Sequence, residues 1–437
     1  MADVKILGAG LAGCEAALWL AEQGHTVDLY EQKPHAYSPA HKQQGFAELV
    51  CSNSLKSDRL DSAAGLLKEE MRRLGSHLLP IAAQCSVAAG GALAVDRNEF
   101  SRLVTEAVEQ CPNITIHRQE VTEIAPHDGI TLVATGPLTQ GALADSINQL
   151  TGGQKLSFYD AAAPIVIGES LDMEKVFAAS RWGKGDADYL NCPFDKEGYE
   201  AFYEALISAE RAPLHDFDGD GEVTVYEGCM PVEIMAKRGP DTLRFGPLKP
   251  VGLTDPNTGR RPWANVQLRR ENQEGTLFNL VGFQTNLKFG EQKRVFQMIP
   301  GLENAEFARY GVMHRNTFLN SPMLLNDTLN LKEYPNVYFA GQITGFEGYM
   351  ESAACGLLAA RAIHARLTQK PLQKLPTNCM TGALLHYITQ ENKDFQPMGA
   401  NMGLLPPLET RIKDKRQRYA EIANRALEAL EQAIHEN

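Results

Sequence analysis

The stretch VKILGAGLAG, residues 4–13, decides the fold of the first part of this chain. Residues 4–7 are mostly apolar and predict a buried strand, and the glycines that follow predict a tight turn. Residues 11–23 predict a helix that Gly24 closes, and residues 26–31 predict a second strand. The order strand, glycine turn, helix, strand is typical of the first unit of a dinucleotide-binding fold.

The glycines of this turn have the spacing G-x-G-x-x-G. The first permits the turn, the second lets the backbone approach a pyrophosphate, and the third lets the helix pack on the strand. The helix N-terminus favours the negative charge, and Glu31 ends the second strand where an acid would bind ribose hydroxyls. The predicted cofactor contacts of this unit are Gly8, Ala9, Gly10, Leu11, Ala12, Gly13 and Glu31.

Two later segments favour FAD over NAD as the dinucleotide. The predicted strand at 130–134 ends in Ala-Thr-Gly, and a late strand at 335–340 leads into GQITG, residues 341–345, before a helix at 351–367. Both segments resemble flavin-contacting parts of two-dinucleotide-type flavoproteins, and the chain has no second G-x-G-x-x-G. The predicted contacts from the later parts of the chain are Val121, Thr135, Gly136, Gly341, Gln342, Gly348 and Tyr349.

Local signals predict further elements. Asp96 followed three residues later by Glu99 forms a capping box, which predicts a helix running to about residue 110. The composition of residues 114–124 predicts a strand. Apolar residues near helical spacing over 419–434 predict an amphipathic helix docked on the protein.

The length and the pattern of elements indicate more than one domain. The chain has 437 residues, whereas a typical domain has about 100–200. From about residue 161 to 320 the alternation of strands and helices becomes irregular, with Pro- and Gly-rich breaks. We therefore predict an α/β fold, in which a discontinuous Rossmann-like FAD-binding domain of the two-dinucleotide type spans residues 1–160 and 321–437. An inserted α+β domain is predicted for residues 161–320.

The composition limits the partners and the location of the protein. Lysines and arginines number 42 against 54 acidic residues, a formal net charge of −12, so a nucleic acid would have to meet a local basic patch. No signal peptide and no apolar run of membrane-spanning length is found, and a cytoplasmic location with no membrane partner is expected. The eight cysteines include no C-x-x-C pair, which predicts reduced thiols and no metal site.

Three long motifs carry a family resemblance: CSNSLKS at 51–57, YEGCMPVE at 226–233 and GQITGFEGYMES at 341–352. With them the chain closely resembles the folate- and FAD-dependent tRNA (uracil-54-C5)-methyltransferases, from the glycine turn to the last helix. The resemblance implies that methylenetetrahydrofolate supplies the carbon, that NADH or NADPH supplies electrons, and that FAD carries the methylene at N5 and reduces it. The implied product is 5-methyluridine at position 54 of the tRNA T-loop.

The resemblance also implies roles for two cysteines. Cys229 would add to C6 of the uracil, and Cys51 would help to remove the proton from C5. Independently of the family, C5 of uracil is a poor nucleophile until a group adds at C6, and a thiolate can add and later leave. Free cysteines are usually buried apolar residues, but Cys229 lies beside Gly228 in a predicted turn, and Cys51 lies in a polar stretch near Lys56.

Residues 216–227 match the pattern of a calcium-binding loop, D-x-[DN]-x-[DN]-G-x₅-E. Such a loop needs a helix on each side, yet residues 223–226 have strand composition, and Gly228 and Pro231 prevent an exiting helix. An acidic, solvated turn is the favoured interpretation, and no metal is predicted.

Residues 260–315 hold nine lysines and arginines against five glutamates, opposite in sign to the whole chain. Cations mixed with Trp263 and amide side chains can bind phosphates and stack on unpaired bases. Pairing of these cations with neighbouring acids on a solvated surface is the alternative. The candidate RNA-binding residues are Arg260, Arg261, Arg269, Arg270, Lys288, Arg294 and Arg315.

Other functions stay open at this point. The same chemistry could act on a ribosomal RNA uridine, and an FAD-dependent oxidoreductase of a small molecule or a flavoprotein that only helps tRNA to fold would share the cofactor site. A related wobble-uridine flavoprotein family is disfavoured, because it carries a long additional C-terminal helical region. The folate-binding residues, the oligomeric state and the choice of nicotinamide are not predicted, although Tyr349 is a candidate for stacking on the pterin.

Overall fold

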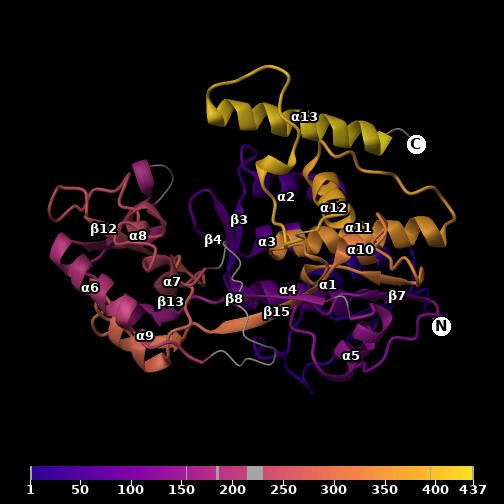
Figure 1. Ribbon diagram of the computed structural model, residues 1–437, viewed down its shortest axis with the longest axis horizontal. Helices are drawn as coiled ribbons and strands as arrows, with labels where there is room; N and C mark the ends of the chain where they lie inside the picture. The colour runs from indigo at the N-terminus through magenta and orange to yellow at the C-terminus, as the bar shows by residue number, and fades with distance from the viewer. Residues whose placement is uncertain (1, 154, 184–186, 214–229, 394, 436–437) are drawn as a thin grey trace.

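The predicted first unit of the chain forms: β1 is Val4–Leu7, α1 is Leu11–Glu22 and β2 is Val27–Glu31. The computed structural model describes residues 2–153, 155–183, 187–213, 230–393 and 395–435 (Figure 1). The side chains of 155–160, 314 and 315 are not described.

A five-stranded parallel sheet in the order β16-β7-β1-β2-β6 forms the centre of the first domain. Its further strands are β6 (Ile114–Arg118), β7 (Ile130–Val133) and β16 (Val337–Phe339). Because β16 pairs with β7, a late segment of the chain lies two strands away from β1. The fold class predicted from sequence, a Rossmann-like α/β domain, is confirmed. The strand predicted at 114–124 is shorter, because β2, its partner among the described strands, ends where Glu31 pairs with Arg118.

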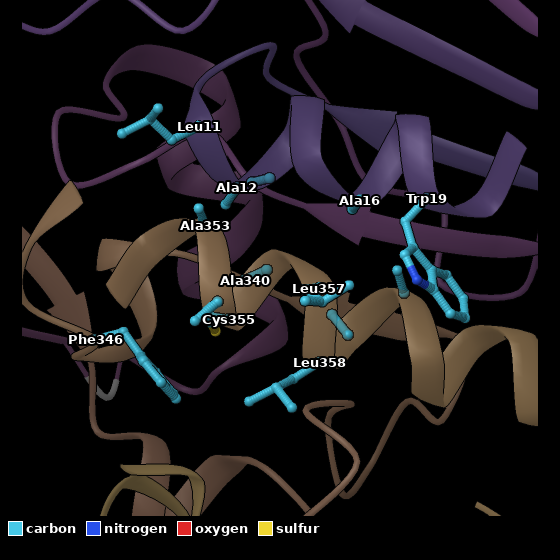
Figure 2. Close-up of a cluster of buried hydrophobic side chains, with 14 of the residues drawn as sticks. Leu11, Ala12, Ala16, Trp19, Ala340, Phe346, Ala353, Cys355, Leu357 and Leu358 are labelled. Atoms are coloured by element: carbon cyan, nitrogen blue, oxygen red, sulfur yellow. The ribbon is translucent and has the colours of Figure 1, made fainter. Parts of the chain in front are cut away.

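Helix α11 (Tyr349–Leu367) packs directly on α1 and brings the third motif to the glycine turn. Small residues allow this approach: Figure 2 shows Ala12 and Ala16 of α1 facing α11. A Cβ atom on Gly356 would lie 2.2 Å from the carbonyl oxygen of Ala12. The Ala- and Gly-rich composition of this late helix is therefore a packing requirement, since larger side chains would separate the two helices.

Helix α4 (Arg97–Glu109) begins at the predicted cap. The Asp96 carboxylate accepts hydrogen bonds from the N–H groups of Asn98 and Glu99 at 2.9 and 3.0 Å. The second half of the capping box does not form: the Asp96 N–H donates to the Cys85 carbonyl, and Glu99 pairs with Arg102. The Asp96 cap fixes the first helical residue, Arg97, which faces the interior at 9 % exposure.

The inserted region forms a second sheet with its own hydrophobic core. This sheet has the order β10-β11-β12-β13-β9-β14, and its described pairings are antiparallel. Its strands are β9 (Ile165–Ile167), β10 (Phe177–Ala178), β11 (Tyr189–Phe194), β12 (Ala264–Arg270), β13 (Leu277–Leu280) and β14 (Phe307–Arg309). The associated helices are α6 (Lys196–Ser208), α7 (Val232–Ala236), α8 (Thr242–Phe245) and α9 (Phe289–Phe296).

Two antiparallel strands, β8 (Lys155–Ala161) and β15 (Met313–Leu319), lie between the two sheets (Figure 1). These strands lie at the two predicted boundaries of the inserted domain, near residues 161 and 320. A small sheet in the order β3-β5-β4 also lies near this junction. Its strands are β3 (Ser54–Ser57), β4 (Ser86–Val87) and β5 (Ala92–Val95).

The remaining helices surround the first domain. They are α2 (Ala63–Arg73), α3 (Leu78–Gln84), α5 (Gly141–Leu150), α10 (Ser321–Leu324), α12 (Met380–Thr389) and α13 (Lys415–His435). Helix α13 runs across the top in Figure 1 and buries Ile422, Ala426, Leu427 and Leu430, as its predicted apolar stripe requires. No helix of the described residues is long and apolar enough to span a membrane.

Candidate active site

The glycine turn between β1 and α1 has the geometry that a pyrophosphate requires. Gly8 has a φ of +96°, and a Cβ there would lie 2.7 Å from the carbonyl oxygen of Ala134. A Cβ on Gly13 would lie 1.9 Å from the carbonyl oxygen of Gly8, whereas one on Gly10 would meet nothing within 4 Å. No side chain caps the start of α1. Its N–H groups and the open space at Gly10 therefore form a cradle for an anion.

Glu31 closes β2 beside this turn and is buried, with 8 % exposure. One carboxylate oxygen accepts from the N–H of Ala9 and the other from the N–H of Lys33, each at 3.0 Å. These two bonds fix the carboxylate at the carboxyl end of the sheet, next to the turn. This is the position from which an acid can accept hydrogen bonds from ribose hydroxyls.

A cavity of about 430 Å³ extends from the glycine turn to Cys51. It lies at the carboxyl ends of β1 and β7, where ligands bind in open α/β sheets. Its walls include the predicted contacts Gly8, Ala9, Gly10, Leu11, Ala12, Glu31, Val121, Thr135, Gly136, Gly341, Gln342 and Tyr349. The turn, the acid and the cavity together fit FAD.

Two of the predicted contacts, Gly13 and Gly348, lie outside the cavity wall but are required by its shape. Gly13 sets the close packing of α1 on the turn. Gly348 has a φ of +127°, and a Cβ there would lie 2.1 Å from the carboxylate of Glu351. The wall also contains residues that sequence patterns did not indicate, among them Tyr37, His41, Glu48 and Asn316. Three of these, Tyr37, His41 and Glu48, lie in the irregular loop after β2, which carries no periodic signal.

Cys51 is half-buried and lines the cavity. Its Sγ lies 3.7 Å from the carbonyl oxygen of Ala161, the last residue of β8. Other cysteines are ordinary core residues: burial raises the pKa of Cys85, Cys355 and Cys379 to about 12 and raises the pKa of Cys14 and Cys192 as well. Cys111 is half-buried but packs against the hydrophobic core. Among the described cysteines, Cys51 alone lines the cavity.

Tyr349, the first residue of α11, connects the third motif to the first. Its hydroxyl oxygen accepts hydrogen bonds from the N–H groups of Cys51 at 2.6 Å and of Ser52 at 3.1 Å. Burial raises the pKa of the Tyr349 hydroxyl, so the group stays neutral. Tyr349 borders the cavity, while its hydroxyl holds the backbone of residues 51 and 52.

Cys229 and residues 216–227, which match the calcium-loop pattern, lie outside the described residues. Within the described part of the chain, no group of three or more His, Cys, Asp or Glu side chains is placed to hold a metal ion. The structure therefore places Cys51 at the cavity, and the chemical roles of Cys51 and Cys229 stay predictions from their motifs.

The candidate RNA-binding cations differ in their surroundings. Arg260, Arg261 and Arg270 are exposed. Lys288 and Arg294 each pair with a glutamate at 2.6 Å, as the alternative interpretation of this basic segment expects. The side chain of Arg315 lies outside the described ones.

Arg269 is not compatible with its predicted role at an RNA surface. It is buried, with 7 % exposure, and its guanidinium donates to Asn53 at 2.9 Å and to Ser52 at 2.7 Å. On an alternating strand its neighbour Arg270 points to the opposite face. The sequence shows that Arg269 is charged. It does not show that β12 points this side chain inward, toward Ser52 and Asn53.

Comparison with known proteins gives consistent results. The family described as glucose inhibited division protein A matches residues 3–371. The methylenetetrahydrofolate--tRNA-(uracil-5-)-methyltransferase TrmFO of Desulforamulus reducens is 60 % identical over 432 residues, which cover 99 % of this chain and 97 % of that protein. The protein of the same name from Halalkalibacterium halodurans is 57 % identical, covering 99 % and 98 %.

Among solved structures, Aquifex aeolicus GidA superposes with a TM-score of 0.68 at 16 % identity, covering 100 % of this chain and 75 % of that one. A second crystal form of the same protein gives a TM-score of 0.69 at 17 % identity, covering 99 % and 77 %. At this identity the likeness shows that the two proteins share a fold.

Proposed function

Since the chain belongs to the family of methylenetetrahydrofolate--tRNA-(uracil-5-)-methyltransferases named TrmFO, we propose that it methylates C5 of a tRNA uridine, at position 54 of the T-loop. The observation that carries this proposal is the half-buried Cys51 thiol on the wall of a cavity that begins at a dinucleotide-binding glycine turn. A cofactor site alone would suit many flavoenzymes; a thiol at its far end suits chemistry on a pyrimidine ring.

FAD fits the cavity: the glycine turn and the N-terminus of α1 would hold its pyrophosphate, and Glu31 would hold its ribose. When bound, FAD supplies the means to accept a one-carbon unit from methylenetetrahydrofolate and electrons from NADH or NADPH. The residues around the cavity bind and orient this group and hold the reactive cysteine. The proposed substrates, tRNA, folate and a nicotinamide, predict a cytoplasmic setting.

The two cysteines divide the work on the uracil. The Cys229 sulfur adds to C6, and the electron pair of the C5–C6 double bond makes C5 nucleophilic. After C5 has received its carbon, the Cys51 thiolate takes the proton from C5. The electrons of the C5–H bond restore the C5–C6 double bond as the Cys229 sulfur leaves C6 as a thiolate. Cys51 thus ends as a thiol and Cys229 as a thiolate.

The tRNA surface that we propose follows strand β12. Arg260 and Arg261 precede the strand, and Arg270 ends it beside the cysteine loop, because the Arg270 carbonyl accepts a hydrogen bond from Asn53 at 2.8 Å. The exposed Trp263 packs against Arg244, whose guanidinium carbon lies 3.7 Å from the ring centroid. The seven-residue strand separates the two ends by roughly 20 Å, so cations can contact phosphates from the cavity outward.

Methyl transfer to a tRNA transcript, with methylenetetrahydrofolate and NADPH or NADH present, tests the activity. The complete system should methylate a transcript that carries U54 and leave one that carries C54 unmodified. Cys51→Ala and Cys229→Ala should each lose activity, while Cys111→Ala, a change at a half-buried thiol outside the cavity, should keep it. No product from the folded, FAD-loaded protein would overturn the proposal, and product from Cys229→Ala would overturn the assigned role of that thiol.

Two further measurements separate the remaining alternatives. A ribosomal RNA fragment offered in competition should remain unmethylated; its preferential methylation would replace tRNA as the substrate. For the surface, replacing Arg260 and Arg261 together by alanine should weaken tRNA binding and reduce its dependence on sodium chloride concentration. Lys374→Ala, an exposed lysine paired with Asp327 in the first domain, is the matched control and should bind normally. Unchanged salt dependence in the double variant would exclude this surface.

A further inference from the structure

The loop at residues 49–53, here called the Cys51 loop, is held almost entirely by side chains from distant elements. The Cys51 carbonyl oxygen accepts from two guanidinium groups, Arg97 at 3.4 Å and Arg309 at 3.2 Å. The Cys51 N–H donates to the Tyr349 hydroxyl at 2.6 Å. Both backbone polar groups of the reactive residue are therefore bound to side chains rather than to other backbone groups.

Each of the two arginines spans the loop with two hydrogen bonds. Arg97 also donates to the carbonyl oxygen of Leu49, and Arg309 donates to that of Val50, each at 2.9 Å. A planar guanidinium that binds two carbonyl oxygens resists rotation more than a single hydrogen bond does. Arg97 belongs to α4 in the first domain and Arg309 to β14 in the second. The loop is thus clamped from both sides of the domain junction.

A third arginine fixes the residues that follow. Arg269 of β12 donates to the side chains of Asn53 and Ser52. Asn53 is fully buried and donates in turn to the carbonyl oxygens of Val95 and Arg270. These contacts leave Cys51 between three guanidinium groups, two of them from the inserted domain.

The charge around the loop is strongly positive. Glu271, with 4 % exposure, is the one carboxylate that pairs with these arginines among the described residues, at 2.6 Å from Arg97. Tyr349 is neutral, so three positive groups face one negative group. Burial lowers the pKa of Arg269 and Arg309, while Glu271 and Cys51 as anions raise it; arginine stays protonated in proteins. From β8 and β15, Ala161 and Asn316 face the cavity without charge.

We infer that Arg97 and Arg309 are positioning residues that hold the Cys51 loop across the domain junction and stabilise Cys51 as a thiolate before substrate arrives. This inference rests on the proposed function only for the use made of that thiolate, the removal of the C5 proton. An electropositive, partly exposed setting is the kind that favours the reactive form of a cysteine. The arrangement also ties the state of the thiol to correct docking of the two domains.

The test is the pH dependence of Cys51 alkylation by iodoacetamide in the FAD-loaded protein, followed at the Cys51 peptide by mass spectrometry. The wild-type rate should titrate with a midpoint below about 8.5, the ordinary value for cysteine. Arg309→Met should move the midpoint up by about one unit, which slows alkylation at pH 7 roughly tenfold and leaves the rate at high pH unchanged. Arg309 is chosen because removing Arg97 would also strand the buried Glu271 carboxylate.

Two variants separate charge from geometry. Arg309→Lys keeps the charge but cannot bind both carbonyl oxygens in the same way, so the alkylation midpoint should stay while kcat for methyl transfer falls. Arg102→Met, an exposed arginine on the same helix as Arg97, should leave both unchanged. FAD absorbance of each variant checks that the protein is folded.

An unchanged midpoint in folded Arg309→Met would overturn the inference, as would a wild-type midpoint at or above 8.5. If Arg309→Met fails to bind FAD, the wild-type midpoint and Arg309→Lys still decide the matter. The alkylation needs no tRNA, folate or nicotinamide. A shifted midpoint without methyl transfer by the wild type would therefore keep this inference and reject the proposed function.

Discussion

The glycine turn and the Cys51 loop border the same cavity and are built in opposite ways. The turn is held by contacts within one βαβ unit: Gly13 packs on the Gly8 backbone, and the Glu31 carboxylate accepts from the Ala9 N–H. The Cys51 loop is held by side chains of α4, β12, β14 and α11. The first is determined by neighbouring sequence, whereas the second exists only when both domains are in place.

This difference predicts two kinds of sensitivity. In the turn, damage follows from adding an atom, because the backbone leaves no room for a Cβ. In the loop, damage follows from removing a group, because buried carbonyl, N–H and carboxylate groups would lose their partners. The cofactor end of the cavity should thus tolerate changes elsewhere in the chain, and the cysteine end should not.

The largest effect is expected from Arg97→Ala. It leaves the Glu271 carboxylate buried without its partner and removes the guanidinium that binds the Leu49 carbonyl oxygen, while the Cys51 carbonyl keeps its bond to Arg309. Removal of one member of a buried ion pair costs about 3–5 kcal/mol. Urea unfolding of the FAD-loaded protein measures the loss. The double variant Arg97→Ala, Glu271→Gln should recover part of it, while Arg102→Ala, a change at an exposed arginine, is the control and should leave stability nearly unchanged. Additive effects of the two single changes would show that the pair is not coupled.

The next effect separates two glycines of the turn. Gly13→Ala places a Cβ against the Gly8 carbonyl and should cost about 2–3 kcal/mol of stability. The variant should also lose FAD binding. A Cβ on Gly10 meets no protein atom, so Gly10→Ala should fold normally. It should bind FAD at least roughly tenfold more weakly, because the pyrophosphate approaches the backbone there. Urea unfolding and FAD fluorescence titration distinguish the two. Equal loss of stability in both variants would contradict the assigned roles.

A smaller effect is expected from Tyr349→Phe. The N–H groups of Cys51 and Ser52 lose their acceptor, which should cost about 1–2 kcal/mol and reduce kcat for methyl transfer through misplacement of Cys51. Thermal unfolding and steady-state kinetics provide the two readings. Tyr387→Phe removes a hydroxyl that donates to the carbonyl oxygen of Gln396 and is the control, with activity unchanged. Full activity of Tyr349→Phe would show that the hydroxyl is not needed to position the Cys51 loop.

The smallest effect concerns Lys68, which continues the support of this segment. Its ammonium donates to the carbonyl oxygens of Leu55 and Ser57 at 2.8 and 2.6 Å. Burial lowers its pKa from 10.5 to about 8. Between these values the unfolded chain binds more protons than the folded protein, so this group makes stability rise with pH. Relative to Lys68→Met, the wild type should gain stability from pH 8 to 10.5.

Urea unfolding at several pH values measures this difference. The exposed Lys370→Met variant is the control and should run parallel to the wild type. A difference between wild type and Lys68→Met that does not change with pH would mean that Lys68 titrates alike in both states.

How far sequence could predict the site depends on the range of each contact. The glycine turn, the Asp96 cap and the late Ala- and Gly-rich helix were predictable, because each depends on residues within one or two turns of the chain. Arg269 shows the limit: sequence gives its charge but not its burial, and the expected RNA contact proves to support the Cys51 loop. The second half of the Asp96 capping box did not form for a different reason: Glu99 pairs with Arg102 on its own helix, and the Asp96 N–H donates to the Cys85 carbonyl.

By itself, the sequence determined the βαβ unit, the dinucleotide cradle and, through three motifs, the family to which the chain belongs. Only the tertiary structure decided what surrounds Cys51. The Arg97 and Tyr349 contacts to it join residues 46 and 298 positions apart, and contacts of that range leave no periodic trace in a sequence. Local geometry fixes a glycine turn wherever it occurs, whereas three arginines converge on one carbonyl-rich loop only after two domains have folded against each other.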